Sequence, residues 1–315
     1  MFTFDTEQKV CRVGGVKFGG RPGEYPTVVV PSIFQKGDKV FEGSRKEGFD
    51  EKRAKELLET SDKLAKETGV PCMADIVATT GEQFKQYIDF VVSVTDMPFC
   101  IDAWVMKPKI EGAKYCADKG LLDRMFYNSL TVWEKNLEQE IKDISDIGVK
   151  HVLLVAFDPA DQMPSGRISG TQKLLDAIDH AGAKFESIFV DTSVMNGPAT
   201  AFCSVANRMI KEKWGFPCAS APSNGSYMWK AAREMWGSKG WTAVDSALEA
   251  MSALMYHDMI FSGPMAGSER IIPAVAMAEA FKATLTFAQD KKLPDLQTHP
   301  LHKLFGDFVE QLKGM

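Results

Sequence analysis

Short apolar runs rich in β-branched residues alternate with longer amphipathic segments along the whole chain of 315 residues. Eight such runs are expected to form strands, over residues 27–33, 72–77, 99–103, 124–129, 151–158, 187–193, 216–221 and 259–263. The segments between them repeat their apolar residues at helical spacing, as Phe84, Tyr87, Ile88 and Val91 do. Strands that alternate with helices in this way predict a parallel sheet covered by helices.

Eight units at a spacing of about 30 residues favour a single closed (β/α)8 TIM barrel. An open doubly wound sheet usually has fewer strands and a glycine-rich first turn, and no GxGxxG follows the first run. Residues 8–18, which contain Gly14-Gly15, predict a hairpin that precedes the barrel and plugs its N-terminal face. We therefore expect one domain over residues 1–315, with residues 1–24 as a hairpin extension.

The ends of the expected helices carry recognisable signals. Asp50 is expected to cap the first helix, and Thr79 with Glu82 resembles a capping box. Gly237 and Gly240 interrupt the helical pattern before the last strand, which predicts a bend or a split helix there.

Composition narrows the class of ligand. The net charge is -5 and no Lys/Arg cluster is present, which disfavours nucleic acid. No apolar run is long enough to span a membrane and residues 1–7 do not resemble a signal peptide, so a cytoplasmic location is expected. The six cysteines lie far apart with no CxxC pair, which argues against thiolate metal sites and disulfides. A small molecule is the expected ligand.

Polar residues close six consecutive expected strands. In a β/α barrel the C-terminal strand ends surround the active site. One such residue is often only a helix cap or a loop residue, but six in succession predict a ring of acceptors and amides around one cavity. These candidates are Asp75, Asp102, Asn128, Asp158, Asp191 and Ser220, and Asn224 follows shortly after the seventh strand.

Two kinds of ligand suit such a ring. A Mg²⁺ ion held by carboxylates alone would make the protein a metal-dependent lyase, and this alternative stays open. Histidine-based metal binding is disfavoured, because the five histidines form no HxH or HxxxH pair at a strand end. A reduced pterin fits better, since its amino and ring N–H groups form a donor edge that a carboxylate binds with two hydrogen bonds. We expect no metal to be bound by this chain.

Short stretches spread over nearly the whole chain resemble the family of the H subunit of tetrahydromethanopterin S-methyltransferase. They are Phe4-Asp5, Gly14-Gly15-Val16, 22–27, 87–91, Ile101-Asp102, Tyr127-Asn128-Ser129 and 273–277. Within this family the chain looks most like the bacterial methylcobalamin:tetrahydrofolate methyltransferases of glycine betaine demethylation. A more distant likeness is to the methyltetrahydrofolate:corrinoid methyltransferases.

The resemblance implies roles for individual residues. Asp102, Asn128 and Asp191 match positions that hold the pterin, Asp75 falls where the distant family has an Asp, and Asn224 matches an amide near N5. It implies an enzyme that moves a methyl group between a corrinoid and N5 of tetrahydrofolate. The corrinoid would come from a separate corrinoid-binding protein, because no DxHxxG is present. A homodimer is also implied.

The loop after the seventh strand departs from the family pattern. Ser223 stands where the family pattern has a His, so the pterin could be tetrahydrofolate or tetrahydromethanopterin. A non-catalytic subunit that only docks the corrinoid protein is the alternative from another functional class. Apolar residues that follow strand ends could form the docking rim, although helix packing explains them equally well: Trp104, Met106, Trp133, Met163, Met195 and Trp229.

Overall fold

Eight parallel strands close into a barrel in the computed structural model, which describes residues 2–41 and 48–315. The predicted fold class is confirmed. Each expected apolar run overlaps one strand, and neighbours along the chain are neighbours in the barrel, with the last strand pairing with the first. The strands are β3 (Val28–Ile33), β4 (Ala74–Val77), β5 (Phe99–Asp102), β6 (Met125–Thr131), β7 (His151–Val155), β8 (Ser187–Asp191), β9 (Cys218–Ser220) and β10 (Met259–Pro264).

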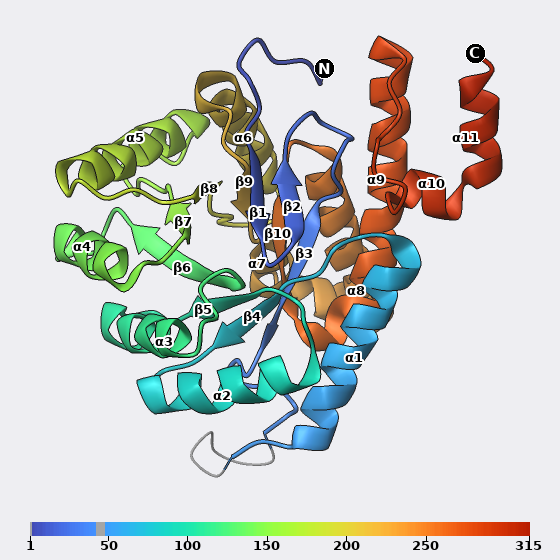
Figure 1. The fold of residues 1–315 in the computed structure, drawn as a ribbon. Helices are drawn as coiled ribbons and strands as arrows, with labels where there is room; N and C mark the ends of the chain where they lie inside the picture. Colours follow the sequence, from blue (N-terminus) through green and yellow to red (C-terminus); the bar gives the residue numbers. More distant parts are fainter. Residues whose placement is uncertain (1, 42–47) are drawn as a thin grey trace.

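Helices surround the barrel and pack their apolar faces on its outer surface (Figure 1). The additional helix α7 follows β9 directly, before the longer helix that completes that unit. The helices are α1 (Glu51–Thr68), α2 (Gly81–Val94), α3 (Met106–Asp118), α4 (Leu137–Ile147), α5 (Pro164–His180), α6 (Thr200–Trp214), α7 (Pro222–Met228), α8 (Ala231–Leu254) and α9 (Ser268–Asp290).

The predicted N-terminal hairpin is present and closes the end of the barrel where the strands begin. It consists of β1 (Val10–Val13) and β2 (Val16–Gly19), joined through Gly14 and Gly15, and it lies across the barrel in Figure 1. The Phe18 ring enters the barrel and packs edge-on against Phe189, with ring centroids 5.0 Å apart. Burying a phenylalanine side chain fully contributes about 2 kcal/mol, so this ring anchors the hairpin.

One of the two predicted N-terminal helix caps is at the predicted residue, and the other lies one residue further along the chain. Asp50 caps α1 as predicted by accepting the Arg53 N–H. The predicted capping box lies one residue further along: Thr80, not Thr79, caps α2, and its hydroxyl accepts the Gln83 N–H. The Gln83 side chain in turn accepts the Thr79 N–H.

The predicted interruption of the helix before the last strand is confirmed. Gly237 lies within α8 at φ 63° and ψ -174°, which are not helical angles, so the helix is kinked there. Glycine adopts this conformation without the steric cost that other residues incur.

The chain ends in two short helices that the sequence patterns above do not predict. These are α10 (Pro300–Leu304) and α11 (Gly306–Lys313), which pack on α9 away from the barrel (Figure 1). The expectation that no run is long enough to span a membrane is wrong for one segment: among the described residues, Met265–Asp290, which includes α9, is long and apolar enough by length and composition. Most of its apolar window, 61%, is buried inside the protein, as in the core helix of a soluble fold.

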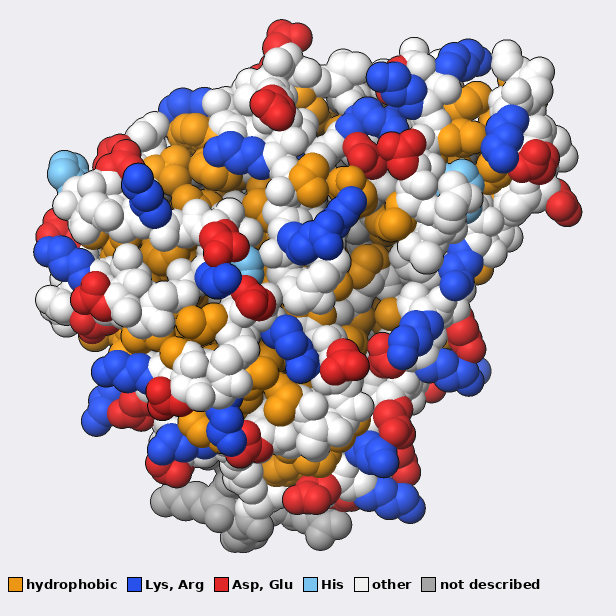
Figure 2. Space-filling model, viewed as in Figure 1, with side chains coloured by type: hydrophobic (Ala, Val, Ile, Leu, Met, Phe, Trp, Pro, Cys, Tyr) orange, Lys and Arg blue, Asp and Glu red, His pale blue; other side chains and the backbone are white. Residues whose placement is uncertain are grey.

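Charges of both signs are interspersed on the face seen in Figure 2, which looks onto the hairpin end of the barrel. No extended basic surface is visible on this face, in keeping with the small excess of acidic residues. This face therefore lacks the concentrated positive charge that attracts a nucleic-acid backbone.

Candidate active site at the C-terminal strand ends

Four of the predicted site residues point into the barrel. Successive side chains of a strand face opposite sides, so a residue two positions after an inward apolar residue also faces inward. The apolar residues Met73, Cys100, Phe126 and Phe189 belong to the packed barrel interior. Two positions later come Asp75, Asp102, Asn128 and Asp191, in that order. These four form a polar layer on top of the apolar interior, where the strands end.

Asp75 is the most enclosed acid of this layer. Its side chain is 5% exposed, and its Oδ1 accepts a hydrogen bond from Asn128 Nδ2 at 3.4 Å. Loss of water around the carboxyl raises the pKa of Asp75 well above its usual range, and the nearby Asp102 carboxylate raises it further. Both effects favour the protonated form of Asp75 over the charged one.

Asp102 lies at the end of the next strand. Burial raises its pKa to about 6, and the positive charge of Lys109 opposes that rise. Lys109 is itself buried on α3: it donates to the carbonyl of Ser129 and forms an ion pair with Glu140 of α4 at 2.9 Å. This lysine therefore stabilises the structure around β6 and supplies positive charge near the acids.

Asp191 closes β8 and is also buried. Its Oδ1 accepts the Ser193 N–H at 2.6 Å, while burial raises the pKa of Asp191 to about 6 despite the nearby positive charge of Arg167. Arg167 is almost fully buried and donates to the backbone carbonyls of Thr192 and Ser193. Arg167 thereby fixes the loop that follows Asp191.

Two predicted residues do not join this layer. Ser220 lies on the opposite face of β9 from the inward residue Ala219, and its hydroxyl is 2.8 Å from Nε2 of His257. The prediction that Ser220 binds the pterin is not supported, because its side chain faces away from the barrel interior.

Asp158 follows β7 and turns back into its own loop. Its Oδ1 accepts the Ala160 N–H at 2.9 Å, and its Oδ2 pairs with Lys173 of α5 at 3.3 Å. The Ala160 N–H and Lys173 lower the pKa of Asp158, which is the opposite of the shift in the buried acids. Asp158 therefore belongs to a loop turn rather than to the polar layer.

Asn224 occupies the first turn of α7, directly after β9. Its side chain is exposed, whereas the neighbouring Ser223 is buried and its hydroxyl donates to the carbonyl of Phe261 on β10 at 2.9 Å. Asn224 thus presents a solvent-facing amide from a backbone that its neighbours anchor at the C-terminal end of the barrel.

No group of three or more His, Cys, Asp or Glu side chains placed to hold a metal ion occurs within residues 2–41 and 48–315. The layer at the strand ends combines three acids with the Asn128 amide, which donates to Asp75. Such a layer can pair with the donor and acceptor edges of a planar heterocycle.

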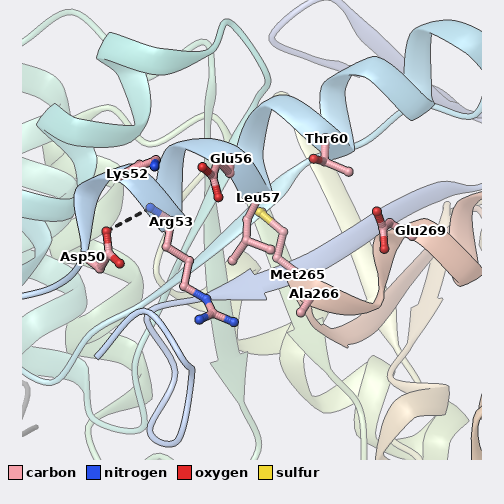
Figure 3. A pocket seen from close by; sticks show the side chains of 9 residues that line it. All are labelled: Asp50, Lys52, Arg53, Glu56, Leu57, Thr60, Met265, Ala266 and Glu269. Atoms are coloured by element: carbon pink, nitrogen blue, oxygen red, sulfur yellow. Dashed lines mark hydrogen bonds between the residues drawn. The ribbon is translucent and has the colours of Figure 1, made fainter. Parts of the chain in front are cut away.

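A separate groove of about 450 Å³ lies outside this layer (Figure 3). It runs between α1 and the 3₁₀ turn η2 (Met265–Gly267), where Leu57 and Met265 lie between the two elements. Lys52 and Arg53 line it together with Glu56 and Glu269, so its charges are mixed, and it contains none of the predicted site residues.

Comparison with known proteins places the chain in a family. The model of the tetrahydromethanopterin S-methyltransferase MtrH subunit matches residues 6–292. The chain belongs to the MtrH family. The MtrH protein of Methanopyrus kandleri, the H subunit of its tetrahydromethanopterin S-methyltransferase, is 31% identical over 87% of this chain and 90% of that protein. The corresponding H subunits of Methanothermobacter thermautotrophicus and Methanosarcina barkeri are each 30% identical over 96% of this chain and their full length.

Solved structures of dihydropteroate synthases share the fold. A Yersinia pestis synthase with a sulfonamide drug has a TM-score of 0.62 at 11% identity and covers 88% of this chain and 100% of its own. The Xanthomonas albilineans synthase with 4-aminobenzoic acid has a TM-score of 0.61 at 13% identity, covering 87% and 98%. At this identity the likeness shows the barrel architecture and nothing about the ligand.

Proposed function

We propose that this MtrH-family methyltransferase moves a methyl group between the corrinoid of a partner protein and N5 of tetrahydrofolate. The observation that carries the proposal is the inward layer of Asp75, Asp102, Asn128 and Asp191 on top of an apolar barrel interior. Two buried acids and a half-buried one beside a buried amide match a ring that offers several N–H donors on one edge and acceptors on the other.

The acids would select the pterin by pairing with its donor edge. A carboxylate that accepts two N–H bonds from the 2-amino and ring N–H groups fixes both the position and the plane of the ring. Asp102 and Asp191 have pKa values near 6, so both are largely ionised at neutral pH and ready to accept such bonds. Asp75 on β4 and Asn128 on β6 are joined by their hydrogen bond and would hold the ring from the two strands that flank β5.

Methyl transfer to the pterin leaves the electron pair of the broken carbon–metal bond on the corrinoid. N5 of the ring forms the new N–C bond and loses its proton to a base or to water. The protein contributes mainly by placing N5 in line with the methyl group and by excluding misaligned approaches. The Asn224 amide can donate to N5 or accept from it, so it can serve N5 before and after the transfer.

Exposed apolar residues around the strand ends support a protein partner there. Trp104 is 99% exposed, and Trp133, Met163 and Trp229 are also exposed, on the segments that follow β5, β6, β7 and α7. Large apolar side chains in water favour a protein contact. We propose that these four residues meet the corrinoid protein; Met106 and Met195 are half-buried and contribute less.

We further propose a cytoplasmic homodimer that serves demethylation of glycine betaine or a similar methylated amine. The outward face of α9 supports self-association, because Met277, Phe281 and Leu285 are exposed at every fourth position. One helical face made of large apolar residues is costly to leave in water.

The deciding experiment mixes the purified protein with methylcobalamin and either tetrahydrofolate or tetrahydromethanopterin under anaerobic conditions. Appearance of the cob(I)alamin spectrum with tetrahydrofolate supports the proposal, and transfer only with tetrahydromethanopterin changes the pterin. No transfer to either pterin, even with a corrinoid protein that binds the chain, would support the docking-subunit alternative. Loss of any activity in EDTA would favour the Mg²⁺-dependent alternative.

A further inference from the structure

Beneath α7 lies a buried polar cluster that the proposed chemistry does not use. Asp245 on α8 is fully buried and accepts hydrogen bonds from the hydroxyl of Ser226 and from the guanidinium of Arg270. Trp241 of α8 donates its ring N–H to the carbonyl of Ser226 at 3.1 Å. One residue of α7, Ser226, is therefore held through both its side chain and its backbone.

Other contacts fix α7 from two further sides. The Ser223 hydroxyl donates to the carbonyl of Phe261 on β10. Gly225 lies so close to Gly197 in the loop after β8 that an added Cβ would be 2.9 Å from the Gly197 Cα. Residues 223, 225 and 226 are thus anchored, and Asn224, between them, is the exposed one.

A second acid, Glu249 of α8, lies near Asp245 and Arg270 in this cluster. Its carboxyl is fully buried, close to the backbone of Ser223 on α7 and to Arg270. Burial raises the pKa of Glu249 well above its usual range and the Asp245 charge adds to the rise, while Arg270 and the backbone of Ser223 oppose it.

We propose that Asp245 is a positioning residue that, through Ser226 and Arg270, sets the direction in which α7 presents Asn224. An amide that must meet N5 loses effectiveness when its backbone moves by a fraction of a bond length, while ring binding by the barrel acids is unaffected. The effect on catalysis rests on the function proposed above; the effect on α7 does not.

The test compares Asp245→Asn and Ser226→Ala with Glu279→Gln. Glu279 is a matched control, because it is a buried carboxylate on α9 that pairs with Lys282 at 2.6 Å and has no bond to α7. We expect both test variants to lower kcat for methyl transfer by about tenfold to a hundredfold with the pterin Kd nearly unchanged. Glu279→Gln is expected to lower the melting temperature without lowering kcat. Equal kcat in Asp245→Asn and Glu279→Gln would overturn the proposal.

Hydrogen exchange of the backbone amides gives a second measurement that needs no activity. In Asp245→Asn and Ser226→Ala, the peptide covering residues 222–228 should exchange faster, while the peptide covering 106–118 should not change. Unchanged protection of 222–228 in both variants would refute the positioning role. If peptide 222–228 exchanges faster in the variants but the unmodified protein transfers no methyl group, Asp245 still positions α7 and the proposed reaction is rejected.

Discussion

Replacing Asp191 by Asn should stabilise the ligand-free protein at alkaline pH and weaken pterin binding. The Asp191 carboxyl is buried at the end of β8, and that burial raises its pKa from 3.8 to about 6. An Asn at this position retains an oxygen that can accept the Ser193 N–H, now 2.6 Å away, but it carries no charge. The substitution therefore removes a buried charge with little change in shape.

The expected size follows from the pKa difference. The folded and unfolded values differ by about 2 units, and each unit is worth about 1.4 kcal/mol, so ionised Asp191 costs about 3 kcal/mol at high pH. Because the folded pKa is the higher one, the protein is free of this cost below pH 3.8 and acquires it as the pH rises through about 6. The gain in the Asn variant should thus be absent in acid and complete at about pH 8.

Urea unfolding at several pH values measures this difference directly. Asp158→Asn is the control, because the Asp158 carboxyl lies in a solvated loop and its pKa is lowered, so removing its charge should give no gain at alkaline pH. A gain for Asp191→Asn that is independent of pH, or a loss of stability at pH 8, would contradict this account of the buried charge. Calorimetry with tetrahydrofolate should show weaker binding by the variant.

Three further outcomes are expected. Asn224→Ala should lower kcat far more than the affinity for tetrahydrofolate, and unchanged turnover in steady-state assays would remove Asn224 from the reaction. The raised pKa of Glu249 means that stability present in acid is lost as the pH rises above 4.5, so Glu249→Gln should make the unfolding free energy decline less over that range. Parallel pH curves for the two proteins would argue against a raised pKa of Glu249. Gly225→Ala should lower the melting temperature and kcat together, because the added methyl group meets Gly197, whereas Gly306→Ala, which meets nothing within 4 Å, should not.

Strand alternation in the sequence predicts the positions of four site residues at the strand ends. Asp75, Asp102, Asn128 and Asp191 each follow an apolar strand residue by two positions, so alternation alone places them on the same side as the barrel interior. The same alternation does not tell which way Ser220 points. Both faces of the three-residue strand β9 carry small residues, so the sequence does not reveal which face is inward.

Residues outside the strands depend on contacts that periodicity does not encode. Asp158 has the same sequence signature as the other strand-end acids, but the Ala160 N–H and Lys173 hold its carboxylate in a loop turn. Asp245 reads as one polar position in a helical pattern, and its link to Ser226 forms only when α7 and α8 pack together.

Local patterns along the chain are sufficient to predict the eight-stranded barrel, the hairpin that closes it and the four polar residues at its mouth, because hydrophobic periodicity and strand alternation involve only near neighbours in sequence. The burial of particular acids, the shifts of their pKa values and the support of Asn224 emerge only when the chain has packed. Those properties arise from desolvation and from hydrogen bonds between segments far apart in the chain, such as Arg270 with Asp245 and Asn128 with Asp75.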